Sequence, residues 1–224
     1  MSYRDFFVKR FRIFSPDGSR WVLLASLLTV VIFFQFGLMA SLPFALTSVF
    51  LMLFYYDPER DLPSHPLAVM SPVDGKVIGI GSFHDPFLER ISQRIRIKAN
   101  LFRVYQARSP TEGKMMEYWP AISVDRPGYT KQLVKGAWWI RTDEGDDVVM
   151  VVRSRSFFGR TYCGAQAGER IGQARRCGRF PVFCNIDILI SEHSFIEVQE
   201  GQSVQAGIHS LATFNHDERD AGQV

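Results

Sequence analysis

Charged residues are missing from one long stretch of this chain. From Trp21 to Tyr56 the sequence holds no Asp, Glu, Lys, Arg or His. About 20 apolar residues are enough for one helix to cross a bilayer, so this run is too long for one straight span and just long enough for two short ones. Gly37 and Pro43 lie near its middle, where a turn is needed. We predict a helical hairpin over 21–56 that spans the membrane or dips into one leaflet.

The flanks of this run predict its orientation. The preceding segment 1–20 is a basic tail, with Arg4, Lys9, Arg10, Arg12 and Arg20 against Asp5 and Asp17. Excess positive charge keeps an amino terminus cytoplasmic, and a hairpin returns the rest of the chain to the same side. The run is too long for a cleaved signal peptide, and no clear small-residue cleavage site closes it. We expect an inner-membrane protein with its main domain on the cytoplasmic side.

Other patterns that are missing exclude several classes of protein. The net charge is only +3 and no run of five basic residues occurs, so nucleic acid is not an expected partner. The five histidines form no HxH or HxxxH pair, and no GxGxxG or phosphate loop is present, so no metal site is predicted. The cysteines lack CxxC spacing and are expected as free thiols in a reducing compartment. These cysteines are Cys163, Cys177 and Cys184.

The chain beyond the hairpin has the texture of a β protein. A charged, proline-rich linker is expected at 57–66, a β domain at 67–214 and a polar tail at 215–224. Short runs rich in Val, Ile and aromatic residues alternate with turn signals, and "TDEGDD" between two such runs predicts a hairpin loop. "FHDPFLERISQR" is the nearest candidate for helix, of one or two turns.

Three segments of the β domain look alike: "SPVDGKVIGI" (71–80), "SPTEGKMMEY" (109–118) and "VQEGQSVQAG" (198–207). Each has an acidic residue, Gly, one residue and then an apolar residue. Tight turns of this kind join short strands in barrel-sandwich domains, although ordinary hairpin turns fit them equally well. We therefore predict a mainly β, barrel-sandwich-like domain that follows the membrane hairpin in the sequence.

Seven arginines gather within residues 153–179. Arginine suits planar, bidentate recognition of phosphate and carboxylate groups. On a membrane-anchored domain the natural anionic partner is a phospholipid headgroup, and a solvated basic face is the alternative. The candidate headgroup-binding residues are Arg153, Arg155, Arg160 and Arg176.

An ordered series of segments carries a family resemblance across essentially the whole chain. The series comprises the hairpin with "YYDPERDLP", "SPVDGKV", "IRIKANLFRVYQARSPTEGK", "VVMVVRSRSFFGRTYC", "GERIGQARRCGRF" and "VQEGQSVQAG". In this order they resemble the short bacterial and archaeal type of phosphatidylserine decarboxylase. The resemblance implies phosphatidylethanolamine synthesis by an enzyme that makes its own pyruvoyl cofactor from a Gly-Ser bond, with an Asp and a His activating the serine.

Two of the three residues that the resemblance calls for are replaced. Asp74 in "SPVDG" matches the family Asp, although alone it is an ordinary Asp-Gly turn. Tyr105 in "VYQARSP" stands at the His position, and "CGRF" matches the cleavage site with Gly178 kept and Arg179 in place of Ser. A guanidinium has no hydroxyl to form an ester, and a tyrosine pKa of about 10 suits proton transfer poorly near neutrality.

The sequence therefore predicts a degenerate family member that is not self-processed and carries no pyruvoyl group. We expect it to bind anionic headgroups in a phospholipid membrane, as a homo-oligomer or as the partner of an active paralogue. The alternative is a decarboxylase with an atypical nucleophile. Cys177 and Cys184 are the candidates, although neither follows a glycine.

Overall fold

The described residues form two compact units, one up to residue 60 and one from residue 62 onward. The structure is a computed structural model. It describes residues 16–56, 60, 62–63, 65–100, 107–121, 128–129, 133–156, 161–181 and 183–215.

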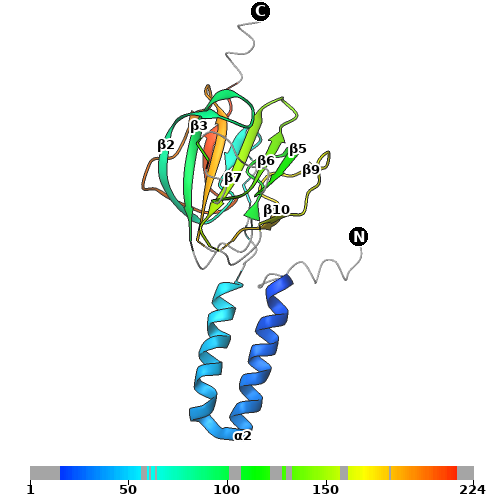
Figure 1. Ribbon diagram of the computed structural model, residues 1–224, viewed down its shortest axis with the longest axis vertical. Helices are drawn as coiled ribbons and strands as arrows, with labels where there is room; N and C mark the ends of the chain where they lie inside the picture. The colour runs from blue at the N-terminus through cyan, green and yellow to red at the C-terminus, as the bar shows by residue number, and fades with distance from the viewer. Residues whose placement is uncertain are drawn as a thin grey trace, which may run out of the picture. The chain divides into compact units, whose positions relative to one another are not determined.

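The first unit contains a helical hairpin, as predicted. Its helix α2 (Pro16–Phe54) is interrupted at Gly37, whose φ of 78° and ψ of −175° are not helical, so two antiparallel arms result (Figure 1). The two arms are joined by a hydrogen bond of 2.9 Å between the hydroxyls of Ser26 and Ser48. Gly37 therefore makes the turn, whereas Pro43 lies inside the second arm.

The hairpin is long and apolar enough to cross a membrane over Gly18–Phe54. At about 1.5 Å per residue, its arms measure about 30 Å and about 26 Å, close to the roughly 30 Å of a bilayer's hydrocarbon core. Large apolar side chains such as Phe34, Phe36 and Met39 are exposed along it. That surface is costly in water and suits a lipid environment.

The second unit is built around an eight-stranded antiparallel sheet in the order β13-β2-β3-β11-β7-β6-β5-β9 (Figure 1). Its strands are β2 (Gly75–Asp85), β3 (Arg90–Ala99), β5 (Gly113–Pro120), β6 (Val134–Arg141), β7 (Asp147–Ser154), β9 (Arg170–Ile171), β11 (Cys184–Ser191) and β13 (Ser203–Val204). The central strands are buried on both faces. One face carries a cluster that includes Phe87, Trp119, Tyr129, Val151 and Leu189.

Two three-stranded sheets complete the β unit, in the orders β1-β14-β12 and β4-β10-β8. Their strands are β1 (Ala68–Met70), β14 (Ser210–Thr213), β12 (Phe195–Ile196), β4 (Ala107–Arg108), β10 (Arg176–Arg179) and β8 (Tyr162–Cys163). The mainly β fold predicted from the sequence is thus confirmed.

One of the two local predictions is confirmed and the other is wrong. "TDEGDD" does join β6 to β7, with Gly145 at a φ of 88°. "FHDPFLERISQR" is not helical, because Asp85 builds a tight turn between β2 and β3. Its carboxylate accepts hydrogen bonds from the main-chain N–H groups of Phe87 at 2.8 Å and Leu88 at 3.4 Å, and the flanking residues pair across the two strands.

Candidate functional site

Two of the similar segments share one local structure. The buried Ser71 donates its hydroxyl to the carbonyl of Val73 at 2.7 Å, and the buried Ser109 donates to that of Thr111 at the same distance. Serine hydroxyls that bond two residues ahead stabilise tight turns. The repeated "SP" pattern therefore marks two equivalent turns, one before β2 and one before β5.

Main-chain hydrogen bonds join these turns to each other and to the chain before β10. Arg108 N–H donates to the carbonyl of Pro72 at 3.0 Å, and Ser109 N–H donates to that of Arg175 at 2.8 Å. The segment 198–207 joins them, since Gly207 N–H donates to the carbonyl of Ser71 at 2.8 Å. The fold thus assembles "SPVDG", "ARSP", "ARRCGR" and "QAG", which are far apart in the sequence.

Asp74 is a buried connector between two of these segments. Its side chain accepts a hydrogen bond of 2.8 Å from the N–H of Ala206, and the residue is 5% exposed. Its carbonyl accepts the N–H of Asn100 at 2.8 Å. The next residue must be glycine, because a Cβ at Gly75 would lie 2.3 Å from the carbonyl oxygen of Lys98. The Asp-Gly pair therefore has a packing role independent of any chemistry.

Gly178 and Arg179 lie at the end of β10, where they pair with Cys163 and Tyr162 of β8. A Cβ on Gly178 would stand 1.7 Å from the carbonyl oxygen of Tyr162, so no larger residue fits. Arg179 is half-buried, and the next residue, Phe180, is buried. The position predicted from the sequence to match the cleavage serine is thus sheet backbone carrying a guanidinium.

Sequence reasoning did not single out Arg108. It lies in β4 opposite Arg176 of β10, it is 5% exposed, and its guanidinium donates to the carbonyl of Ala174 at 3.0 Å. A buried arginine needs such partners to offset its desolvation. Its position in the "VYQARSP" motif is the sequence feature from which Arg108 could have been identified.

The arginines predicted for headgroup binding lie on different sheets. Arg153, in β7, forms an ion pair of 3.4 Å with the buried Asp187 and stacks 5.6 Å above the ring of Tyr129. Arg155 is exposed just beyond β7, while Arg176 is half-buried in β10. The predicted positions Tyr105 and Arg160 lie outside the described residues.

A second basic feature, which we call the basic row, crosses four adjacent strands of the large sheet. Lys76, Lys98, Asn185 and Arg153 are successive partners on β2, β3, β11 and β7. Directly paired residues point to the same face, and like charges there repel. Within the described part of the chain, no ion pair involves Lys76 or Lys98.

In the neighbouring row of paired residues, the charge of Arg96 is already balanced by an ion pair. Arg96 binds the fully buried Asp187, with 2.8 Å between Nε and Oδ1, and this hydrogen bond raises the pKa of Arg96. The carboxylate thus holds Arg96 and Arg153 in place, while Lys76 and Lys98 remain exposed. The alternation in "RIRIK" (94–98) places its three basic residues on one face of a strand, so the sequence did contain this signal.

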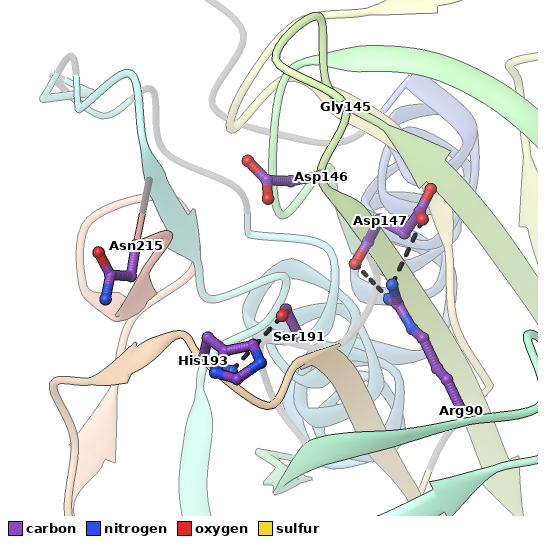
Figure 2. Close-up of a pocket in the computed structure, with 7 residues that line it drawn as sticks. All are labelled: Arg90, Gly145, Asp146, Asp147, Ser191, His193 and Asn215. Carbon is purple, nitrogen blue, oxygen red and sulfur yellow. Dashed lines mark hydrogen bonds and ion pairs between the residues drawn. The ribbon is translucent and has the colours of Figure 1, made fainter. Parts of the chain in front are cut away.

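A pocket of about 310 Å³ lies at the β6–β7 turn, and none of these residues lines it (Figure 2). Asp147 on its wall accepts hydrogen bonds from Arg90 at 3.3 Å, Arg141 at 2.8 Å and Trp139 at 2.7 Å. His193 lies beside Ser191 on the opposite wall. Because Asp147 is already neutralised by two arginines, the pocket has the character of a structural ion-pair site.

Comparison with known proteins agrees with the assembled motifs. The sequence profile of the phosphatidylserine decarboxylase family matches residues 47–211. The chain is 29% identical over 201 residues to the phosphatidylserine decarboxylase proenzyme of Nitrosomonas europaea, covering 87% of this chain and 93% of that protein. It is 28% identical over 206 residues to the proenzyme of Burkholderia multivorans, covering 89% and 95%. The chain belongs to the phosphatidylserine decarboxylase family.

The family's self-generated pyruvoyl group does not fit the residues of this chain. Gly178 is present and sterically required, but the next side chain is that of Arg179, which has no hydroxyl from which such a group is made. Among the described residues, no three His, Cys, Asp or Glu side chains gather as metal ligands do. At the position predicted from the sequence for the cleavage serine, Arg179 cannot supply this group.

Proposed function

We propose that this chain is an unprocessed, catalytically degenerate phosphatidylserine decarboxylase homologue that binds anionic phospholipid headgroups at the membrane. The observation that carries the proposal is Arg179 at the position of the self-cleaving serine. Formation of the cofactor needs a side-chain oxygen that can attack and then leave, and a guanidinium offers neither. The hairpin provides the membrane anchor.

The burial of the two candidate cysteines weighs against decarboxylation through an atypical nucleophile. Burial raises the pKa of Cys184 to about 12. The pKa of Cys177 is also raised, first by its hydrogen bond to Cys163 and then by burial. The thiolate is the reactive form of cysteine, so both are poor nucleophiles near neutral pH.

Headgroup binding is supported by the two lysines of the basic row, which form no ion pair with any of the described residues. Lys76 and Lys98 face each other on adjacent strands, with Arg153 two strands further along the row. Their mutual repulsion is relieved when an anion approaches. A phosphate-bearing lipid headgroup carries such a negative charge. The apolar hairpin holds the chain at the membrane, where these headgroups lie.

The mass of the intact protein tests the proposal. The full chain, purified from membranes, is expected to give one species near 25.6 kDa. Two fragments, with the smaller beginning near residue 179 and carrying a keto-acyl amino terminus, would refute it. Incubation with phosphatidylserine, followed by assay for phosphatidylethanolamine, gives the second readout, and no conversion is expected.

A further inference from the structure

Two cysteines lie side by side at the end of the β8–β10 pair. Cys163 is the partner of Gly178 across the two strands, and the residue before Gly178 on β10 is Cys177. Gly164 N–H donates to the carbonyl of Cys177 at 2.5 Å, which fixes the two backbones at this point. The register between β10 and β4 shifts between Arg176 and Gly178, so Cys177 lies at a bulge.

The two thiols differ in exposure and in acidity. Cys163 is half-buried, whereas Cys177 is 6% exposed. A hydrogen bond between the two sulfur atoms lowers the pKa of Cys163 to about 7 and raises that of Cys177. Burial and the charge of Glu169 oppose the lowering of the Cys163 pKa, and the charge of Arg108 opposes the raising of the Cys177 pKa.

We propose that Cys163 and Cys177 form a thiol–disulfide exchange site that reacts with low-molecular-weight disulfides. An accessible thiol beside a buried one, held by a strand pair, provides an attacking and a resolving group. The site is independent of the decarboxylase chemistry, and its product ties β8 to β10 beside Gly178 and Arg179.

The reaction balances in two exchange steps. The Cys163 thiolate attacks one sulfur of glutathione disulfide, which forms a mixed disulfide and releases one glutathione thiolate. The mixed disulfide removes the Cys163 thiolate, whose hydrogen bond is the largest cause of the raised pKa of Cys177. The Cys177 thiol then loses its proton and attacks the Cys163 sulfur, which forms the internal disulfide and releases the second glutathione. Two protein thiols are oxidised by two electrons, and one glutathione disulfide is reduced to two thiols.

The third cysteine is a built-in control. Cys184 lies in β11, it is 1% exposed, and burial raises its pKa to about 12. It has neither the accessibility nor the acidity needed for the first step. Near pH 7, Cys163 should therefore react with a maleimide at least about tenfold faster than Cys184.

The test uses the full chain in detergent, equilibrated in buffers of reduced and oxidised glutathione, quenched with acid and alkylated. In oxidised buffer the wild type is expected to lose two of its three alkylatable thiols, and Cys184→Ser to lose both of its remaining two. Cys163→Ser should retain both of its thiols. Cys177→Ser should trap glutathione on Cys163, because no resolving thiol remains.

Several outcomes would overturn the proposal. Retention of all three thiols in oxidised buffer would show that the exchange does not occur. A disulfide that includes Cys184 would show that the wrong pair is assigned. Absence of the glutathione adduct in Cys177→Ser would remove Cys163 as the attacking group. Unchanged melting temperatures of the serine variants are the control for folding.

Discussion

Gly178 offers the sharpest test of how this fold constrains the family's processing position. Replacing it by alanine places a Cβ 1.7 Å from the Tyr162 carbonyl oxygen, 2.7 Å from the carbonyl carbon and 2.9 Å from the Cα of Cys163. Ordinary contacts are 3.4–4 Å, so the two backbones must separate by about 1.7 Å. No side-chain rotation relieves this clash, because all three atoms belong to the backbone of β8.

The expected loss in free energy of unfolding follows from the contacts between β8 and β10 that this separation breaks. Overpacking a tight site costs about 1–3 kcal/mol, and each lost hydrogen bond of the β8–β10 pair costs about 1 kcal/mol. We expect Gly178→Ala to lower the free energy of unfolding of the β unit by about 3–4 kcal/mol. For a domain of this size that corresponds to a melting temperature lower by roughly 6–15 °C.

Tryptophan fluorescence during thermal unfolding measures this change, because Trp119, Trp138 and Trp139 all lie in the β unit. The matched control is Gly164→Ala on the same strand pair, where the added Cβ would lie 3.6 Å from its nearest neighbour, the carbonyl oxygen of Cys177. The steric argument is refuted if Gly178→Ala melts within about 2 °C of Gly164→Ala.

Three further predictions concern the proposed site. The double variant Arg179→Ser with Tyr105→His should regain cleavage into two fragments by intact mass, because Asp74 and Gly178 are retained; a single uncleaved species would show that the site has changed beyond these two positions. Asp74→Ala should lower the free energy of unfolding by about 1–3 kcal/mol by orphaning the N–H of Ala206, whereas Asp74→Asn keeps an acceptor and should lose less than half of that in the same thermal assay. Lys76→Gln with Lys98→Gln should weaken binding of a short-chain phosphatidylserine at least about tenfold by calorimetry, while Lys114→Gln, an exposed lysine on β5 outside the basic row, should leave it unchanged.

Features that depend on local composition could be predicted from the sequence. The uncharged run and its single central glycine define the hairpin, since a turn between two helical arms needs a residue that tolerates the φ of 78° seen at Gly37. The "TDEGDD" loop was equally visible, with Gly145 supplying the positive φ. Asp85 was missed, because an Asp-Pro pair fits the start of a helix as well as it fits a turn.

Features that depend on strand register could not be predicted. Lys76 and Lys98 meet only because β2 pairs with β3 in one register, and a shift by one residue would turn them to opposite faces. The Cys163–Cys177 contact has the same origin, since β8 and β10 carry no spacing motif that marks two cysteines as neighbours. The burial of Arg108 also arises from segments distant in sequence.

The packing of this domain gives reasons to keep two residues of the family site even where the chemistry is lost, as we propose for this chain. Gly178 and Asp74 are retained under constraints that have nothing to do with catalysis, namely the backbone of β8 and the N–H of Ala206. At position 179 the strand partner is Tyr162, which is 57% exposed, and Arg179 itself is half-buried. Under the assignment that we propose, the scaffold holds an arginine at a position where the reaction needs a serine, and the family's glycine and aspartate then indicate the fold of a chain rather than its activity.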